Sequence, residues 1–360
     1  MSHPSVSITP FGAVPGLGNA SLFTLRQKSG CTVTLSDYGA TWVGWTTPDR
    51  EGRFADILLG FDSAEGFAKH TAYAGATCGR HANRIARGRC VVDGRELKLA
   101  VNNGPNHLHG GKVGFDRHLW TATVGGAPEA PSVTFSRRSP AGEEGYPGNL
   151  DVTVTYTLLP DDAVKIEYHA TTDATTVLNL TNHAYFNLGG HASGDCLHHR
   201  LKLHAQLYVP TDATAIPTGE LAKVAGTPFD FRESHVIGAR INEKDTQLGY
   251  GRGYDHCFVI DGAPETLRPA ATLTHPASGR VLEVETTEPG LQVYTGNWLA
   301  ECCEGVPGKA GAQYGMRAAV ALETQRLPDS PNRPAFRGVL LRPGELFRST
   351  TVYRARQAGA

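Results

Sequence analysis

The feature that most constrains the fold of this chain is a period of two in its apolar residues. Apolar and polar side chains alternate through Asp151–Leu158, and the pattern continues through Val164–His169. Such alternation is typical of β-strands with one buried face, because successive side chains of a strand point to opposite sides. A turn-rich Pro160–Asp162 segment separates the two runs. The sequence therefore predicts a β-hairpin with one buried face.

The rest of the chain extends this pattern. Alternation returns at Leu282–Glu285, followed by a Glu288–Gly290 turn and a short run at Leu291–Tyr294. The 42 glycines and 22 prolines are spread throughout, as many turns require. Helical periodicity is scarce, and short helices are expected only near Ser63–Lys69 and His235–Ile241. We therefore predict an all-β protein, one large antiparallel β-sandwich with few short helices.

The organisation of the chain points to one unit. No composition break, low-complexity linker or fixed-spacing repeat divides the 360 residues, so we expect a single domain over 1–360. The 34 Lys and Arg nearly balance the 35 Asp and Glu, and the densest basic run, Arg80–Arg89, is interrupted by small and apolar residues. Because nucleic-acid binding needs a basic face, no nucleic-acid partner is expected.

Location is predicted from missing signals. Met1–Pro4 lacks the basic and apolar regions of a signal peptide, and no apolar stretch reaches 18 residues, so no membrane partner is expected. Seven scattered cysteines without C-x-x-C spacing are typical of reduced, buried thiols. We expect a cytoplasmic protein, and the sequence is compatible with a monomer or a weak homodimer.

Two polar segments near the first third of the chain suggest ligand binding. Asn83 and Arg84 offer forked donors that could bind hydroxyl groups, although residue type alone favours a structural turn with solvated arginines. In an extended strand, His107 and His109 would share one face and could hold a metal. No third ligand follows at a useful spacing, so hydrogen bonding to a polar ligand is the better interpretation and no metal is expected.

Two further segments carry groups suited to proton transfer. His183 lies among Asn, Tyr and Phe, and its ordinary pKa near ~6.5 suits an acid or base at neutral pH. Glu323 follows the apolar run Ala318–Leu322, and partial burial would raise its pKa toward that of a general base. The alternatives are a hydrogen-bonded structural histidine and a salt bridge at a strand end.

The last two segments are consistent with recognition of a polyhydroxylated ligand. Asp255 could accept hydrogen bonds from hydroxyls, or cap a turn after Gly249–Gly253. Gln292 could bind a hydroxyl. Trp298 could present an apolar ring to the ligand, although core packing is the default for an isolated tryptophan.

Taken in chain order, these six segments resemble the aldose 1-epimerase (galactose mutarotase) family. Weaker similarity through Tyr38–Thr41, Leu59–Asp62 and Gly145–Gly148 extends the resemblance over nearly the whole chain. NHAYFN together with LETQ is highly specific. The matching runs are GRHANRIARG, NNGPNHLHGG, TNHAYFNLGG, YDHC, LQVYTGNW and LETQRLPDSPN. The resemblance implies a galactose mutarotase-like supersandwich with a sugar bound in an open cleft.

The resemblance also implies roles for individual residues. It makes His183 the acid that protonates the ring oxygen and Glu323 the base that removes the anomeric hydroxyl proton. The implied reaction interconverts the α and β anomers of free hexoses such as galactose and glucose, without a cofactor. We expect His183 to start protonated and Glu323 ionised. The residues implied to hold the aldose substrate are Asn83, Arg84, His109, Asp255 and Gln292.

Two departures and three alternatives stay open. His81 stands where an aromatic or aliphatic residue is more familiar, and Arg326-Leu327 replaces a more usual aromatic after ETQ. A hexose-6-phosphate 1-epimerase would need a cationic pocket, for which Arg80, Arg87 and Arg326 are available. A glycosidase would need two carboxylates, Glu323 and Asp255, and would leave the histidine without a role. A non-catalytic carbohydrate-binding protein would bind galactose without speeding its mutarotation.

Overall fold

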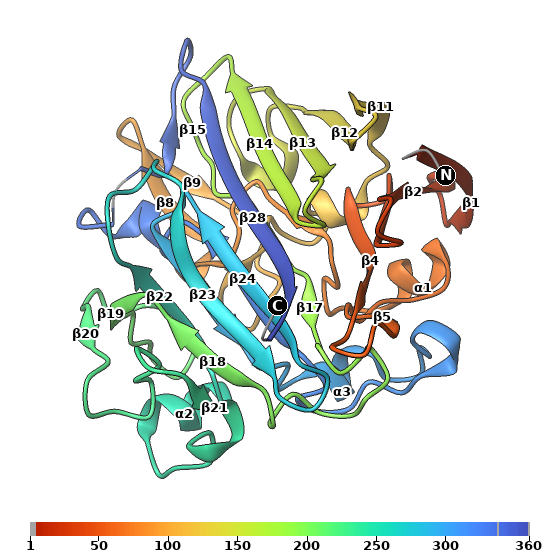
Figure 1. Cartoon of the computed structure of the whole chain (residues 1–360). Helices are drawn as coiled ribbons and strands as arrows, with labels where there is room; N and C mark the ends of the chain where they lie inside the picture. The colour runs from red at the N-terminus through yellow and green to blue at the C-terminus, as the bar shows by residue number, and fades with distance from the viewer. Residues whose placement is uncertain (1–4, 337, 359–360) are drawn as a thin grey trace.

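A computed structural model describes residues 5–336 and 338–358 of the chain. Its largest element is a nine-stranded antiparallel sheet, which faces the viewer in Figure 1. In spatial order its strands are β11 (Thr121–Ala127), β12 (Ala130–Ser139), β13 (Leu150–Leu158), β14 (Val164–Thr172), β28 (Phe347–Gln357), β24 (Arg280–Thr286), β23 (Arg268–His275), β18 (Arg200–Leu203) and β21 (His235–Val236).

The predicted hairpin is confirmed as β13–β14. The two strands pair in antiparallel register, with Leu158 opposite Val164. Val152, Val154 and Tyr156 are at most 1% exposed, so every second residue of β13 enters the core as the alternation requires.

A six-stranded antiparallel sheet packs against the buried face of the first sheet. Its strands, in order, are β17 (Tyr185–Phe186), β26 (Val320–Gln325), β25 (Gly290–Tyr294), β22 (Asp255–Ile260), β19 (Ala205–Tyr208) and β20 (Ala222–Lys223). The Tyr353 hydroxyl of β28 donates to the Leu322 carbonyl of β26 over 3.0 Å, and one apolar core joins both sheets. The predicted β-sandwich is confirmed. The Glu288–Gly290 turn carries the chain from one sheet to the other.

The N-terminal strands form a separate five-stranded sheet, and four strand pairs complete the β-structure. The five strands are β1 (Ser5–Val14), β2 (Gly18–Arg26), β3 (Thr32–Ser36), β4 (Thr41–Pro48) and β5 (Phe54–Asp56). The pairs are β6 (Thr77–Cys78) with β16 (Thr181–Asn182), β7 (Arg84–Ile85) with β10 (His107–Leu108), β8 (Arg89–Val92) with β9 (Arg95–Lys98), and β15 (Thr176–Val177) with β27 (Leu340–Leu341).

Helical structure is sparse, as predicted. The α-helices are α1 (Ala64–Lys69), α2 (Thr246–Gly251) and α3 (Leu299–Cys302). The 3₁₀ turns are Ala86–Gly88, Phe115–Arg117, Glu143–Gly145, Ile237–Ala239, Lys309–Gly311 and Ser330–Asn332. No helix in the described part of the chain exceeds six residues, so none could cross a bilayer.

One predicted helix is confirmed and the other is wrong. Ser63 caps α1 by accepting a hydrogen bond from the Gly66 amide over 3.3 Å. At 235–241 the chain instead forms β21 and a single 3₁₀ turn, because β21 pairs with β18 and Gly238 weakens any helix there.

Candidate active site

A cleft of about 880 Å³ brings together six of the seven predicted site residues. They come from segments far apart in the chain: β7 supplies Arg84, β22 supplies Asp255 and β26 supplies Glu323. Of the three others, Asn83 directly precedes β7, while His109 and His183 each directly follow a two-residue strand. The seventh, Gln292 of β25, reaches the site by donating to Asp255 Oδ1 over 2.6 Å.

The strand geometry of β26 explains why Glu323 faces the cleft. Thr324 lies within hydrogen-bond distance, 2.6 Å, of Thr351 of β28, so its side chain enters the sandwich core. Successive side chains of a strand alternate, so Glu323 points to the opposite side. Gln292 lies directly across from it in the β25–β26 register. The apolar run before Glu323 therefore positions one carboxyl at the base of the cleft.

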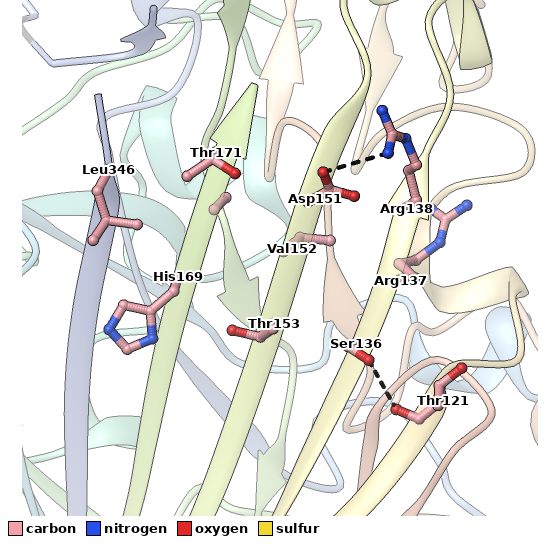
Figure 2. Close-up of a pocket in the computed structure, with 11 residues that line it drawn as sticks. Thr121, Ser136, Arg137, Arg138, Asp151, Val152, Thr153, His169, Thr171 and Leu346 are labelled. Atoms are coloured by element: carbon pink, nitrogen blue, oxygen red, sulfur yellow. Dashed lines mark hydrogen bonds and ion pairs between the residues drawn. The ribbon is translucent and has the colours of Figure 1, made fainter. Parts of the chain in front are cut away.

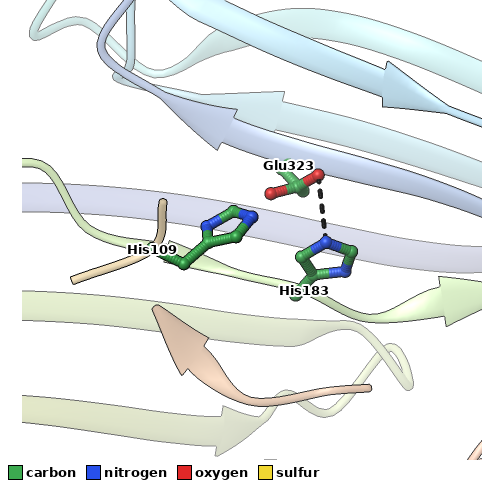
Figure 3. A group of neighbouring side chains, drawn as sticks. All are labelled: His109, His183 and Glu323. Atoms are coloured by element: carbon green, nitrogen blue, oxygen red, sulfur yellow. Dashed lines mark ion pairs between the residues drawn. The ribbon is translucent and has the colours of Figure 1, made fainter. Parts of the chain in front are cut away.

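His183 and Glu323 form a close pair. His183 Nε2 lies 3.5 Å from Glu323 Oε1, and their side chains are only 6% and 2% exposed (Figure 3). The His183 backbone is fixed on both sides, because it donates to the Ala76 carbonyl and accepts from the Gly75 amide. The acid and base proposed from the sequence thus lie together.

The surroundings of this pair shift both pKa values against the charge state expected from the sequence. Burial lowers the pKa of His183 to about 4, only partly opposed by its own backbone and Asp255. Burial, reinforced by the negative charge of Asp255, raises the pKa of Glu323 well above its ordinary value, against the influence of Arg84. Loss of hydration is the largest cause of both pKa shifts, and it disfavours the charged form of each residue.

His109 completes a group of three side chains that resembles a metal site. One candidate ligand atom from each of His109, His183 and Glu323 lies within 4.8 Å of the others (Figure 3). However, His109 Nδ1 accepts a hydrogen bond from the Asn83 amide over 3.2 Å. A neutral imidazole that accepts at Nδ1 carries its proton on Nε2, which then has no lone pair for a metal. This tautomer fits a donor to a ligand oxygen, and the three residues do not fit a metal ion.

His107 and His109 do not share a face, contrary to the sequence interpretation. Strand β10 ends at Leu108, and His109 has a left-handed φ of 49°, which breaks the alternation. The two His107 nitrogens lie 2.6 Å from the Ala100 carbonyl and 2.5 Å from the Tyr146 hydroxyl. His107 is therefore a structural residue, buried away from the cleft.

A polar network holds the remaining site residues. Arg84 donates through Nε to Asn103 Oδ1 over 3.0 Å, and its Nη2 lies 4.0 Å from Asp255 Oδ2. The Asn83 side chain accepts from the Arg84 amide over 2.8 Å. Asn103 lies in one of the six segments but was not singled out as a site residue, because its contact with Arg84 depends on the pairing of β7 with β10.

Three buried polar atoms of the site have no partner among the described residues. They are His183 Nδ1, Glu323 Oε2 and Gln292 Oε1. Buried polar atoms normally have hydrogen-bond partners, and exceptions suggest a ligand or water.

Aromatic side chains also line the cleft: Tyr73, Tyr185, Tyr250, Tyr294 and Trp298. Trp298 is 40% exposed, so the default expectation of core packing is wrong. Tyr73 lies outside all six segments, and no sequence signal identified it.

The three arginines considered for a phosphate pocket do not line the cleft. Arg80 is 1% exposed and donates to four backbone carbonyls and to Ser139. Arg326 lies 3.3 Å from Glu288, and Arg87 is exposed elsewhere. The departure at His81 also lies outside the cleft: His81 is fully buried, with neither ring nitrogen hydrogen-bonded to a described residue.

A second hollow, of about 430 Å³, lies on the solvent face of the nine-stranded sheet. Figure 2 shows Asp151, Thr153 and His169 projecting from β13 and β14, with Arg138 beside Asp151. The Arg138–Asp151 ion pair spans 3.8 Å between side chains that are both more than half exposed. We refer to this region as the outer hollow.

Comparisons with known proteins identify the family of the chain. Residues 21–354 match the family described as Aldose 1-epimerase. The chain is 45% identical to galactose mutarotase of Bos taurus, over 97% of this chain and 98% of that protein. It is 39% identical to aldose 1-epimerase of Escherichia coli K12, over 92% and 94% of the two chains.

Solved structures give the same result. An aldose epimerase homologue from C. elegans superposes with a TM-score of 0.86 at 33% identity, covering 94% of this chain and all of that one. Galactose 1-epimerase from Lactobacillus acidophilus superposes with a TM-score of 0.85 at 28% identity over 99% of both chains. With its family match, its relatives and its sandwich fold in agreement, the chain belongs to the aldose 1-epimerase family.

Proposed function

We propose that the protein is an aldose 1-epimerase that interconverts the α and β anomers of free hexoses, galactose and glucose among them. The observation that carries this proposal is the buried His183–Glu323 pair, 3.5 Å apart in the cleft. Opening a cyclic hemiacetal requires one proton to leave the anomeric hydroxyl and one to reach the ring oxygen. A base and an acid side by side can perform both transfers in one step.

The reaction proceeds by two proton transfers between the pair and the sugar. Ionised Glu323 takes the anomeric hydroxyl proton while protonated His183 gives its proton to the ring oxygen, and the C1–ring oxygen bond breaks. The open aldehyde rotates about C1–C2 and presents its other face. Glu323 then returns a proton to the carbonyl oxygen as the ring closes, and His183 takes the proton of the attacking hydroxyl. Each group contributes roughly 10²–10⁴-fold.

The directions of the two pKa shifts favour one end of this cycle. Neutral His183 with protonated Glu323 is the form that exists after ring opening and is ready for ring closure. To begin from the closed sugar, the proton must pass from Glu323 to His183, which requires compensation for two buried charges. Arg84 favours ionised Glu323, and Asp255 favours protonated His183.

The other cleft residues supply recognition. His109 Nε2 and Arg84 donate to sugar oxygens, while Asp255 and Gln292 Oε1 accept from sugar hydroxyls. A site built to satisfy such groups discriminates strongly, because an incorrect ligand leaves a buried polar atom without a partner. No residue role in this scheme requires a metal or an organic cofactor.

Polarimetry tests the proposal directly. We would follow freshly dissolved α-D-galactose and α-D-glucose with wild-type protein, Glu323→Gln and the matched control Asp151→Asn, whose carboxylate lies in the outer hollow. We expect fast relaxation with wild type and with the control, and a loss of about 10²-fold or more in Glu323→Gln. A wild-type rate equal to that of buffer with both sugars would refute the proposal; glucose 6-phosphate and then binding assays would test the alternatives.

Three expectations stay predictions from the sequence: a cytoplasmic location, a single-domain organisation and a monomer or weak homodimer. They are tested by fractionation of cells, by limited proteolysis and by sedimentation over a range of protein concentrations.

A further inference from the structure

Tyr73 occupies an unusual place beside the proposed acid. It lies in the loop between α1 and β6 and lines the cleft. Its ring centroid is 4.7 Å from that of His109 and 6.1 Å from that of His183, and the Tyr73 and His183 rings are inclined to each other by only 24°. Tyr185 packs against His183 at 4.9 Å. The imidazole of His183 therefore has aromatic rings around it that limit its rotation.

The backbone at Tyr73 is strained. Its φ of 56° lies in the left-handed region, which bulky residues rarely adopt. Strained residues of this kind persist where surrounding contacts fix them, and they cluster at functional sites. The loop is indeed fixed: the Ala72 amide donates to His70 Nδ1 over 2.9 Å, and the Ala76 amide donates to the Tyr73 carbonyl over 3.0 Å.

The turn that contains Tyr73 also holds the backbone of His183. The Gly75 amide donates to the His183 carbonyl over 2.9 Å, and the His183 amide donates to the Ala76 carbonyl over 3.0 Å. Gly75 is required, because a Cβ there would lie 2.1 Å from the Trp42 carbonyl oxygen. One turn thus contacts both the backbone and, through Tyr73, the ring of His183.

We propose that Tyr73 is a positioning residue for the reaction, whose ring keeps the His183 imidazole aimed at the sugar ring oxygen. The proposal rests on the proposed function. It assigns no proton transfer to the Tyr73 hydroxyl, so the ring and not the oxygen carries the role. A misplacement of the acid by about 1 Å can cost on the order of 10² in rate, so loss of the ring lowers kcat more than it raises KM.

The test compares Tyr73→Phe with Tyr73→Asn. Phenylalanine keeps the ring and serves as the matched control, while asparagine removes the ring and tolerates the left-handed backbone. We expect kcat for α-D-galactose within about 3-fold of wild type for Tyr73→Phe. For Tyr73→Asn we expect kcat to fall by about 10-fold or more, with KM changed by less than about 3-fold. Tyr73→Gly replaces Tyr73→Asn should the latter fail to fold, as judged by circular dichroism and thermal melting.

Three results would overturn the proposal: an unchanged kcat in Tyr73→Asn, an equal loss in Tyr73→Phe, or a rise in KM with kcat intact. A readout without activity separates this test from that of the function. The ring-proton NMR signals of His183, identified by their loss in His183→Asn, should move or broaden in the free Tyr73→Asn protein and stay in place in Tyr73→Phe. Unmoved signals in both would also overturn it, whether or not wild type catalyses mutarotation.

Discussion

The cleft and the outer hollow contain the same kinds of side chain but differ in their surroundings. Each has a histidine and a carboxyl: His183 and Glu323 in the cleft, His169 and Asp151 in the outer hollow. In the cleft both side chains are at least 94% buried, whereas Asp151 is 59% exposed and His169 is also exposed. Figures 2 and 3 show the difference, with separated side chains on an open sheet face and a converging group in the cleft.

This difference shows that burial, and not residue type, makes a histidine and a carboxyl suited to proton transfer. In the cleft, removal of water changes the pKa of both groups and leaves polar atoms without partners. On the sheet face, water satisfies every exposed polar atom and screens the ion pair. The volume of a hollow therefore does not by itself identify an active site; the burial of its polar side chains does.

The largest expected effect contrasts the two histidines. His183→Asn should lower kcat for galactose about 10²–10⁴-fold, because the ring oxygen loses its acid, whereas His169→Asn should leave kcat within about 2-fold. Polarimetry at pH 7 measures both. Equal losses in the two variants would show that the comparison between the regions is wrong.

The next effect concerns the charge of Asp255. Asp255→Asn should lower kcat/KM about 10–100-fold, since a hydrogen bond to a charged group contributes about 1.5–3 kcal/mol. Asp255 raises the pKa of both His183 and Glu323, so removing its charge lowers both. The pH–kcat profile should therefore shift to lower pH on both limbs. A profile that is unchanged, or that shifts upward, would contradict this assignment; Asp151→Asn is the matched control.

A third prediction concerns His81, a buried histidine outside the cleft whose ring nitrogens have no hydrogen-bond partner among the described residues. Burial lowers the pKa of His81 to about 3 in the folded chain, against ~6.5 unfolded. The unfolded state then binds the extra proton, so stability is lost as pH falls from 6.5 toward 3.

His81→Leu removes this penalty together with two unsatisfied nitrogens. It should raise the free energy of unfolding by about 1–2 kcal/mol at pH 7.5, with a further gain of about 1.4 kcal/mol at pH 5.5. Urea titrations at the two pH values measure the difference, and kcat should stay near wild type. A gain that is the same at both pH values would refute the pKa argument.

The smallest effect is expected in the outer hollow. Arg138→Ala breaks the exposed Arg138–Asp151 pair and should change the free energy of unfolding by no more than about 0.5 kcal/mol, with unchanged activity. Urea unfolding and polarimetry check both statements. A loss of activity here would give the outer hollow a role that its exposure does not indicate.

The sequence by itself determined the local features of this protein. Alternation in Asp151–Leu158 predicted β13 and its buried face, and Ser63 with its following helix was predicted correctly, because both depend on neighbours in the chain. The family motifs identified His183 and Glu323 as the candidate pair, and the structure places them 3.5 Å apart. The family itself was identified correctly from the same motifs.

Only the tertiary structure decided which side chains share the cleft and in what state. His107 separates from His109 because of one left-handed residue, and Arg80 turns inward to backbone carbonyls. Tyr73 reaches His183 through a turn 110 positions earlier in the chain. The pKa shifts of His183 and Glu323, which oppose the expected ion pair, follow from burial. Packing and desolvation depend on contacts between distant segments, and those contacts are not encoded in any local pattern.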